Sequence, residues 1–290
     1  MTRRSAAAQT AVGPMLIAAV EHQEPPERRL VDDDLAASFL PAHLRALAAL
    51  ARTEAVRRAL MAGSERQGPG LWPSIACRKR LIDERLSDPL NETDAVVVLG
   101  AGLDSRGCRI ARHSDLPVFE VDLPSNVARK ADALRRALGG TPASVHLVPA
   151  DFERDDLMGA LRSAGYDDTA RTFFIAEGLL QYLTPDAVTA TLSQLGGAAT
   201  GSRLVFTYIR QDFVDGTDTY GADAVYRRFR GRRPVWLSGL VPERLGEWLA
   251  ELGWRLDEQA GPSYFRDLYI RPTGRALTAS PIEWTALAHR

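Results

Sequence analysis

The sequence predicts a doubly wound α/β fold, and two patterns support this prediction. From Thr93 onward, short apolar runs alternate with helical stretches. Continuous apolar strands are typical of a parallel sheet covered on both faces, and right-handed crossovers between such strands give a doubly wound arrangement. The second pattern lies in residues 95–109, AVVVLGAGLDSRGCR, where an apolar run ends in a glycine turn before a helix can begin. A strand, glycine turn and helix in this order indicate a nucleotide-like ligand.

The predicted core spans residues 93–209 and alternates five strands with helices. The strands are expected at Ala95–Leu99, Val118–Asp122, Val145–Ala150, Thr172–Ala176 and Arg203–Tyr208. Helices are expected between them at Ser105–Arg112, Ser125–Leu138, Asp155–Ala164 and Pro185–Leu195. Thr184 precedes the last of these helices and is its expected N-cap, because a threonine hydroxyl can accept from the first free backbone N–H groups.

The segments on either side of this core complete one predicted domain over residues 1–290. Residues 1–92 are expected to form a helical cap, since Asp34–Leu60 and Ser74–Leu86 carry apolar residues at three- and four-residue spacing. Residues 210–240, rich in aromatic side chains and arginines, are too long for an idle turn and are expected to form a substrate lid. In residues 241–290 a helix is expected at Pro242–Leu252 and strands at Trp254–Gln259 and Phe265–Ile270. The sheet would then have about seven strands.

Composition excludes several classes of protein. The net charge is −1, so no global basic field attracts nucleic acid or an anionic membrane. Cys77 and Cys108 are too few for a disulfide framework or a four-ligand zinc site, and buried reduced thiols and no metal are expected. Residues 1–22 are basic and then apolar, but Gly13-Pro14 interrupts the apolar part. A cytoplasmic protein without a membrane span is expected; its oligomeric state stays open.

The glycine turn itself restricts the ligand. Gly100 and Gly102 permit a tight turn and close backbone approach, but Ser105 stands where a dinucleotide fingerprint has a third small residue. Asp104 places a carboxylate where a pyrophosphate would approach. Both features speak against an NAD-dependent or FAD-dependent enzyme. They suit a cofactor with no phosphate and a cationic amino-acid end, and S-adenosyl-L-methionine fits that description.

Three further acids follow successive predicted strands. Asp122 ends the second strand, Asp151 follows the third and Glu177 follows the fourth. In a doubly wound sheet the carboxyl ends of the strands form the ligand crevice, so these acids should line one site. Asp122, twenty residues past Gly102, suits a ribose hydroxyl. Arg78 could pair with a ligand carboxylate, although a solvated helix face is an equal alternative.

Four segments carry a resemblance to a known family. They read LGAGLDSRGCR, FEVDLPSNVARK, PADFERDDL and FIAEGLLQYLTPDAV, in this order. Together they resemble the leucine carboxyl methyltransferase family, which includes methyltransferases of aromatic polyketide pathways similar to tetracenomycin synthesis. The resemblance covers roughly residues 10–210 and implies a class I methyltransferase fold that uses S-adenosyl-L-methionine.

The resemblance also implies roles for residues at matching positions. These are Arg78 for the family's basic motif, Gly100 and Gly102 for the turn, Asp122 for the ribose, Asp151 and Phe152 for the adenine, Glu177 for the methionine ammonium, and Tyr182 for the family's tyrosine. The chain departs from the family at Ser105 and at Gly107-Cys108, which weakens the match of the loop. The 210–240 segment shows no pattern typical of a known substrate.

The expected reaction is methyl transfer to an oxygen of a small molecule, and Tyr182, Tyr208 and Arg210 are the candidate catalytic residues because each should lie at the carboxyl side of the sheet. Arg210 could hold an acceptor carboxylate, and the lid aromatics could stack on a planar polyketide-like substrate. The histidines, expected away from the strand ends, are His22, His43, His113, His146 and His289. None of them is therefore an obvious general base.

The lack of an obvious base bears on the acceptor. A carboxylate acceptor needs no general base, whereas a phenol with a pKa of about 10 benefits from one. The sequence therefore leans towards a carboxylate acceptor.

Two other functions stay open at this point. A protein C-terminal carboxyl methyltransferase is suggested by the family name and would need a groove for a peptide tail. A non-catalytic S-adenosyl-L-methionine-binding paralogue is the second alternative, and the retained acids argue against it.

Overall fold

The computed structural model describes residues 12–290 and contains a seven-stranded sheet in the order β3-β2-β1-β4-β5-β7-β6. The strands are β1 (Ala95–Leu99), β2 (Val118–Asp122), β3 (Val145–Pro149), β4 (Thr172–Ala176), β5 (Arg203–Ile209), β6 (Arg255–Ala260) and β7 (Glu283–His289). β1 to β5 are parallel, and β7 runs antiparallel between β5 and β6. The chain order reverses between β1 and β4, so the doubly wound prediction is confirmed. A ligand crevice is expected at this reversal.

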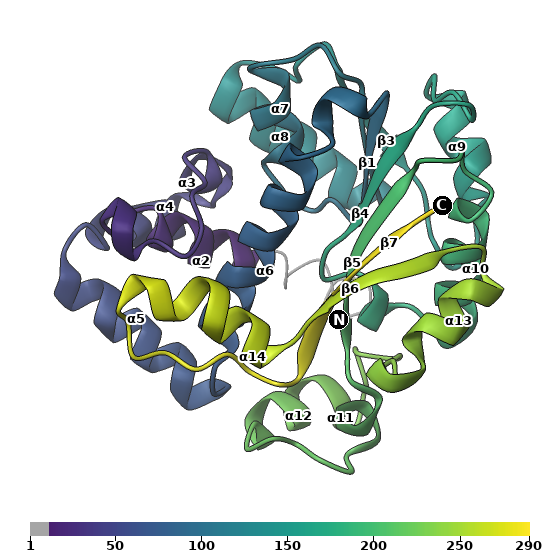
Figure 1. The fold of residues 1–290 in the computed structure, drawn as a ribbon. Helices are drawn as coiled ribbons and strands as arrows, with labels where there is room; N and C mark the ends of the chain where they lie inside the picture. Colours follow the sequence, from purple (N-terminus) through teal and green to yellow (C-terminus); the bar gives the residue numbers. More distant parts are fainter. Residues whose placement is uncertain (1–11) are drawn as a thin grey trace.

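Helices cover both faces of the sheet (Figure 1). The helices α6 (Leu71–Ser87) and α7 (Arg106–Ala111) pack on one face, α8 (Pro124–Leu138) packs on β2 and β3, and α9 (Leu157–Ser163), α10 (Pro185–Leu195) and α13 (Leu245–Glu251) pack on the other face. Successive strand residues point to opposite faces. Val97 and Leu99 accordingly enter the core under α9 and α10, and Val96 and Val98 enter the core under α6. Because the side chains on both faces of the strand are buried, the strand sequences are continuous apolar runs.

The N-terminal region is a separate helical layer, drawn in purple and blue in Figure 1. It contains α2 (Val12–Glu21), η1 (Pro26–Arg28), α3 (Ala36–Phe39), α4 (Ala42–Leu50), α5 (Glu54–Gln67) and, after α6, η2 (Leu90–Glu92). Buried Glu21 links this layer together, because it accepts from Trp72 Nε1 at 2.7 Å and from two nitrogens of Arg275 at 2.7 and 2.9 Å. The basic start of the chain lies outside the described residues. Within residues 12–290 no helix is both long and apolar enough to cross a bilayer.

The C-terminal region corrects one predicted strand. Phe265–Ile270 is helical, forming the end of α14 (Pro262–Phe265) and the π-helix η5 (Arg266–Ile270), followed by η6 (Arg271–Thr273). Phe265, Tyr269 and Ile270 are buried together against the N-terminal helices, and the residues between them are exposed. That four-to-five-residue spacing places one helical side in the core. The seventh strand is instead β7, whose residues 285–289 pair with β5 on one side and with β6 on the other.

The other predicted elements agree with the structure to within about two residues at most ends. Thr184 is the N-cap of α10, since its hydroxyl accepts from Ala187 N at 3.3 Å. His289 is the last residue of β7. Because β7 runs antiparallel to β5, this histidine pairs with Arg203 and lies at the amino ends of the parallel strands, away from their carboxyl ends.

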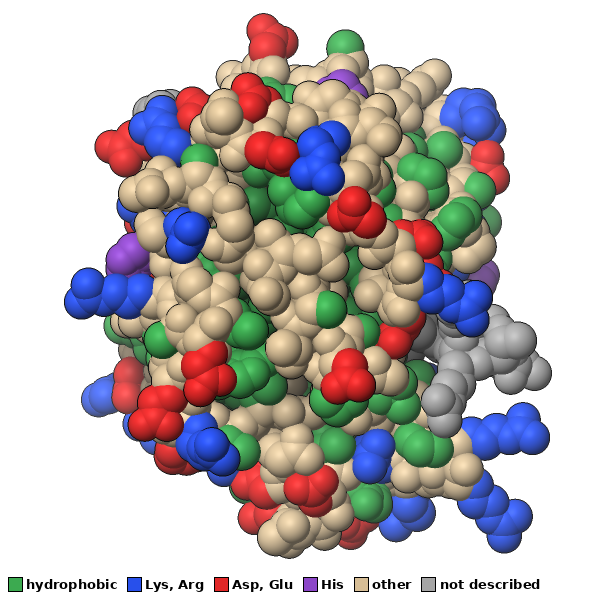
Figure 2. Space-filling model, turned by 90° about the vertical axis from the view of Figure 1, so that its right-hand side faces the viewer, with side chains coloured by type: hydrophobic (Ala, Val, Ile, Leu, Met, Phe, Trp, Pro, Cys, Tyr) green, Lys and Arg blue, Asp and Glu red, His purple; other side chains and the backbone are tan. Residues whose placement is uncertain are grey.

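The segment after β5 folds as α11 (Gln211–Asp215), α12 (Asp223–Arg230) and an extended stretch to η4 (Pro242–Arg244). Figure 1 shows α11 and α12 below the end of β5. Phe213, Val225 and Trp236 form a small apolar cluster with Ile209 and Ile282, which fixes this segment against the sheet. Figure 2 shows the flank that carries α9, α10 and α13, where acidic and basic side chains are interspersed, as the net charge of −1 leads one to expect.

Candidate active site

A cavity of about 450 Å³ lies at the carboxyl ends of β1, β2, β4 and β5. The glycine loop, the residues after β3 and the η3 turn (Leu180–Tyr182) form one side, and α2, α6 and the 210–240 segment close it. Its volume is in the range typical of small-molecule sites. The structure brings eight of the ten predicted site residues to this one cavity, including all seven of the predicted cofactor residues.

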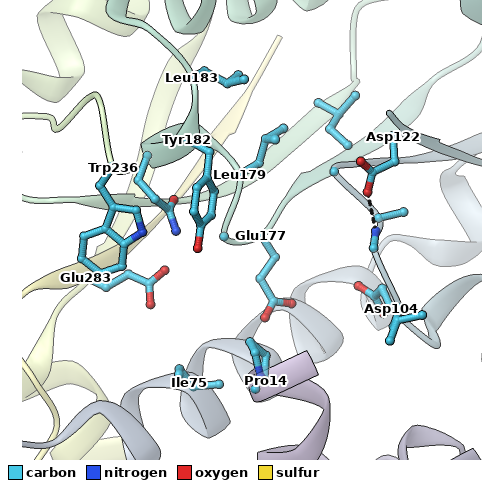
Figure 3. A pocket seen from close by; sticks show the side chains of 18 of the residues that line it. Pro14, Ile75, Asp104, Asp122, Glu177, Leu179, Tyr182, Leu183, Trp236 and Glu283 are labelled. Carbon is cyan, nitrogen blue, oxygen red and sulfur yellow. Dashed lines mark hydrogen bonds between the residues drawn. The ribbon is translucent and has the colours of Figure 1, made fainter. Parts of the chain in front are cut away.

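The glycine loop is tied directly to the end of β2. Gly100 and Gly102 have φ values of +65° and +50°, a left-handed conformation that favours glycine. The Asp122 carboxylate accepts from Gly102 N at 2.7 Å, a bond drawn as a dashed line in Figure 3. It also accepts from Leu123 N and Asn126 Nδ2, both at 2.7 Å. Burial raises the pKa of Asp122 against the opposing effect of these bonds. The carboxylate is therefore held rigidly beside the loop.

Asp151 and Phe152 follow β3 on the same side of the cavity. Both are half-buried, and Phe152 also packs against the apolar core beneath α9 and α10. Asp151 accepts from Glu153 N at 3.2 Å, which closes the turn. An apolar ring next to an acid can hold a flat heterocycle by packing and hydrogen bonding together.

Arg78, on α6, lies between the glycine-loop end of the cavity and its other end. Its Nε donates to Glu177 Oε1 at 3.0 Å, and its Nη1 donates to Glu283 Oε2 at the start of β7. Among residues 12–290 no acceptor takes a hydrogen bond from Arg78 Nη2, so this nitrogen remains available to a ligand carboxylate. Lys79 Nζ lies 3.5 Å from Glu177 Oε2 and is a second cation at the cavity wall.

Glu177 is surrounded by cations. Besides Arg78 and Lys79, Arg106 Nη1 donates to Glu177 Oε2 at 2.6 Å. Burial alone would raise the pKa of Glu177, but the three cations outweigh burial and hold that pKa at about 2. Asp104 is likewise buried, and Arg106 holds its pKa well below the ordinary value. Both acids therefore remain ionised at neutral pH.

The far end of the cavity is lined by apolar and aromatic side chains. Tyr182, Trp236 and Phe229 lie there, and the rings of Phe229 and Trp236 stack with centroids 4.3 Å apart. In Figure 3 the Tyr182 hydroxyl points towards the region between the carboxylates of Glu177 and Glu283, and Trp236 stands beside it. A flat apolar molecule would fit against such a wall.

Two predicted catalytic residues are not among the residues that line this cavity. Tyr208 is buried in the core under α9 and α10, and its hydroxyl donates to Gln259 Oε1 at 2.6 Å. Its position in β5 turns the side chain to the face opposite the N-terminal helices. Arg210 pairs with Asp212 at 2.7 Å and lies over the rings of Tyr220 and Trp284. The structure therefore corrects their expected position, because Tyr208 lies in the core and Arg210 lies at the start of the 210–240 segment, both outside the cavity lining.

The charges of the cavity suit a cation. Six carboxylates and three cations line it: Asp104, Asp122, Asp151, Glu153, Glu177 and Glu283 against Arg78, Lys79 and Arg228. A sulfonium and an ammonium group are favourable in such a field. The rigid Asp122 carboxylate could accept hydrogen bonds from a ribose. Arg78 Nη2 could donate to an amino-acid carboxylate. The residues present thus fit S-adenosyl-L-methionine.

Comparisons with known proteins agree with this arrangement. The family described as "Leucine carboxyl methyltransferase" matches residues 11–196. A Frankia alni protein named "Putative S-adenosyl-L-methionine-dependent methyltransferase" is 33% identical over 256 residues, covering 86% of this chain and 82% of that protein. A Mycobacterium sp. (strain KMS) protein of the same name is 36% identical over 198 residues, which cover 63% of this chain and 62% of that protein.

A solved structure supports the fold alone. The crystal structure of "a putative methyltransferase" from Thermobifida fusca has a TM-score of 0.55 and 17% identity, covering 81% of this chain and 88% of that chain. Fold, site and relatives define an S-adenosyl-L-methionine-dependent methyltransferase of class I architecture. The chain belongs to the leucine carboxyl methyltransferase family.

Several residues of the cavity were missed by the sequence reasoning. Lys79 lines the cavity and Arg106 bonds to Glu177, but neither was assigned a role from the sequence. Gln181 and Glu283 were not singled out, whereas Trp236 was expected only as one of several aromatic side chains in the 210–240 segment. Gln181 is adjacent to Tyr182 in a matched motif, so that motif could have indicated it. Nothing in the sequence indicates Glu283, because it depends on where β7 enters the sheet.

Proposed function

We propose that this chain transfers the methyl group of S-adenosyl-L-methionine to an oxygen atom of a small, flat molecule, such as a polyketide-like metabolite. The observation that carries the proposal is that one cavity extends from the glycine loop to the stacked rings of Phe229 and Trp236. The cofactor end and an aromatic end suited to an acceptor are therefore contiguous. Methyl transfer depends mainly on alignment of the acceptor and exclusion of water, and α2, α6 and the 210–240 segment border the cavity where both are needed.

The proposed cofactor contacts rest on the resemblance to the family and are supported by the residues that line the cavity. Asp122 would hold the ribose, and Asp151 and Phe152 the adenine. Arg78 Nη2, with Lys79 close by, would bind the methionine carboxylate, and Glu177 would face the ammonium group. When bound, S-adenosyl-L-methionine supplies an activated methyl group, so the chain's own side chains need only orient the acceptor and keep the site dry.

The proposed acceptor site is closed by residues 210–240, which we interpret as a substrate lid. Its Phe229 and Trp236 provide a flat surface of the kind that holds aromatic ligands by packing. Tyr182, which packs against the same apolar cluster, remains the proposed catalytic or positioning residue. Tyr208 and Arg210 would act only indirectly, by fixing β5 and the base of the lid.

A transfer assay with labelled S-adenosyl-L-methionine tests this function. The acceptors are a panel of aromatic acids, phenols and a peptide with a free C-terminal carboxylate. We expect label on one or more small aromatic compounds and none on the peptide. Release of methanol from the product by alkali separates a methyl ester from a methyl ether. Label on the peptide alone would contradict the proposal and identify a protein carboxyl methyltransferase.

A further inference from the structure

Three side chains at the acceptor end carry buried polar atoms without a partner. They are Glu283 Oε1, Trp236 Nε1 and Gln181 Oε1, and these three residues are 5, 6 and 4% exposed. No hydrogen-bond partner for these atoms lies within residues 12–290. All three side chains line the cavity, and Figure 3 shows Trp236 and Glu283 next to each other.

Such atoms call for an explanation, because most buried polar groups in proteins are hydrogen-bonded. A ligand that bonds to them would offset the cost of having removed them from water. Each atom is covered by its neighbours, so its side chain must turn slightly to meet a ligand. Rotamer changes of this kind are common on binding.

The chemistry of the atoms specifies the group that would fit. The indole Nε1–H of Trp236 can only donate, and the carboxylate oxygen of Glu283 can only accept. A hydroxyl group satisfies both, since its oxygen accepts from Trp236 while its proton is donated to Glu283. The amide of Gln181 presents a donor and an acceptor, so it can bond to the remaining side of the same group.

A carboxylate acceptor fits poorly by the same reasoning. It has no proton to share with Glu283 Oε1, and two like charges would face each other in a buried place. Arg78 pairs with the other oxygen, Oε2, so that Oε1 has no hydrogen-bond partner among residues 12–290. The cavity lining has six carboxylates and three cations, and this excess of negative charge also disfavours a carboxylate acceptor.

We propose that the acceptor is a hydroxyl group of phenol or enol type, and that Glu283 is the residue that accepts its proton. This inference rests on the proposed function and names its substrate class. In the step, the acceptor oxygen forms a bond to the methyl carbon as the carbon–sulfur bond breaks. The electron pair of that bond stays on sulfur, and the hydroxyl proton moves to Glu283 Oε1. Trp236 holds the oxygen in line, and Arg78 keeps the carboxylate oriented.

Binding of two matched probes tests the inference without relying on turnover. The probes are 2-naphthol, neutral near pH 7, and 2-naphthoate, ionised there. Titration calorimetry measures each dissociation constant on the full chain saturated with S-adenosyl-L-homocysteine. We expect 2-naphthol to bind at least about tenfold more tightly than 2-naphthoate. In Glu283→Gln an N–H₂ donor replaces the acceptor, so the preference should fall to about one or reverse.

Matched variants control for general damage to the fold. Glu258→Gln alters a carboxylate that also pairs with an arginine, Arg85, but lies outside the cavity lining, and it should keep the wild-type preference. Trp236→Phe should weaken 2-naphthol binding about fivefold while leaving the Arg78 ion pairs in place, and Trp248→Phe on α13 should change nothing. Trp236→Phe keeps the inference testable if Glu283→Gln does not fold.

The outcomes separate the inference from the function on which it rests. Loss of the 2-naphthol preference in Glu283→Gln supports it. Equal or tighter binding of 2-naphthoate by the wild-type chain, no measurable binding of either probe, or a preference that survives Glu283→Gln overturns it while the methyltransferase function stands. Failure of S-adenosyl-L-homocysteine to bind would overturn the proposed function and the inference with it.

Discussion

The carboxylate of Asp122 accepts a hydrogen bond from the backbone N–H of Gly102 at 2.7 Å, joining the end of β2 to the glycine loop after β1. The acid therefore has two roles, since it shapes the loop and faces the cavity. Its other oxygen is held by Leu123 N and Asn126 Nδ2. A rigid acceptor of this kind binds a ribose at little entropic cost.

Replacing Asp122 with alanine should weaken cofactor binding strongly. Hydrogen bonds to a charged group are worth about 1.5–3 kcal/mol, so we expect the affinity for S-adenosyl-L-homocysteine to fall roughly 10- to 100-fold. Calorimetric titration measures the effect. The exposed residue Asp115 provides the control, because Asp115→Ala should bind as the wild type does. Unchanged binding by Asp122→Ala would remove the ribose assignment.

The lowered pKa of Glu177 should make the free energy of unfolding depend on pH. Its pKa is about 2 in the folded chain and near 4.5 when unperturbed. Above pH 4.5 both states are ionised and the stabilisation is fully present. As the pH falls towards 2 the unfolded chain takes up the proton first, so about 3 kcal/mol of the free energy of unfolding is lost. Urea denaturation followed by circular dichroism from pH 7 to pH 2 measures this loss.

The variant Glu177→Gln isolates that contribution. At pH 7 it leaves Arg78, Lys79 and Arg106 without their shared anion, so the free energy of unfolding should drop by about 3 kcal/mol. Its further loss between pH 4.5 and pH 2 should be smaller than that of the wild type. Glu251→Gln, an exposed change, should follow the wild-type curve. Identical acid profiles for Glu177→Gln and the wild type would show that the cations do not act on this acid.

The two predicted tyrosines should respond differently to the same change. Tyr208→Phe removes a buried hydrogen bond to Gln259 and should lower the free energy of unfolding by about 1–2 kcal/mol, with methyl transfer within about twofold of the wild type. Tyr182→Phe alters a group in the cavity and should slow methyl transfer at least about tenfold. Single-turnover transfer and urea denaturation distinguish the two. Equal slowing in both variants would contradict the placement of Tyr208 outside the site.

The two cysteines should be unreactive in the folded chain. Cys77 and Cys108 are free and buried, and burial raises the pKa of Cys108 to about 11 and that of Cys77 further. Because the thiolate is the reactive form, Ellman's reagent at pH 8 should release almost no colour until urea is added. Rapid release of one equivalent from the native chain would show that a thiol is accessible.

The glycine-loop end of the cavity was predictable from the sequence because its signals are local. Gly100 and Gly102 follow an apolar run, and Asp122 ends the next one. Strand ends in a parallel sheet meet at one edge, so positions along the chain translate directly into positions in space. The resemblance to a known family indicated Phe152 and Tyr182 in the same way.

The acceptor end was not predictable, because it depends on contacts between distant segments. Glu283 reaches the cavity only because β7 inserts between β5 and β6, and the sequence placed the last strand at Phe265–Ile270 instead. Trp236 comes from a segment without regular periodicity. Tyr208 was misplaced because alternation along β5, rather than position at its end, decides which face its side chain occupies.

A crystal structure of the chain with S-adenosyl-L-homocysteine tests the central claim most directly. The account predicts the ribose on Asp122, the adenine beside Asp151 and Phe152, and the amino-acid carboxylate on Arg78. The sulfur should face the end of the cavity formed by Tyr182, Trp236 and Glu283. A ligand bound outside this cavity, or one whose sulfur points away from Glu283 and Trp236, would contradict it.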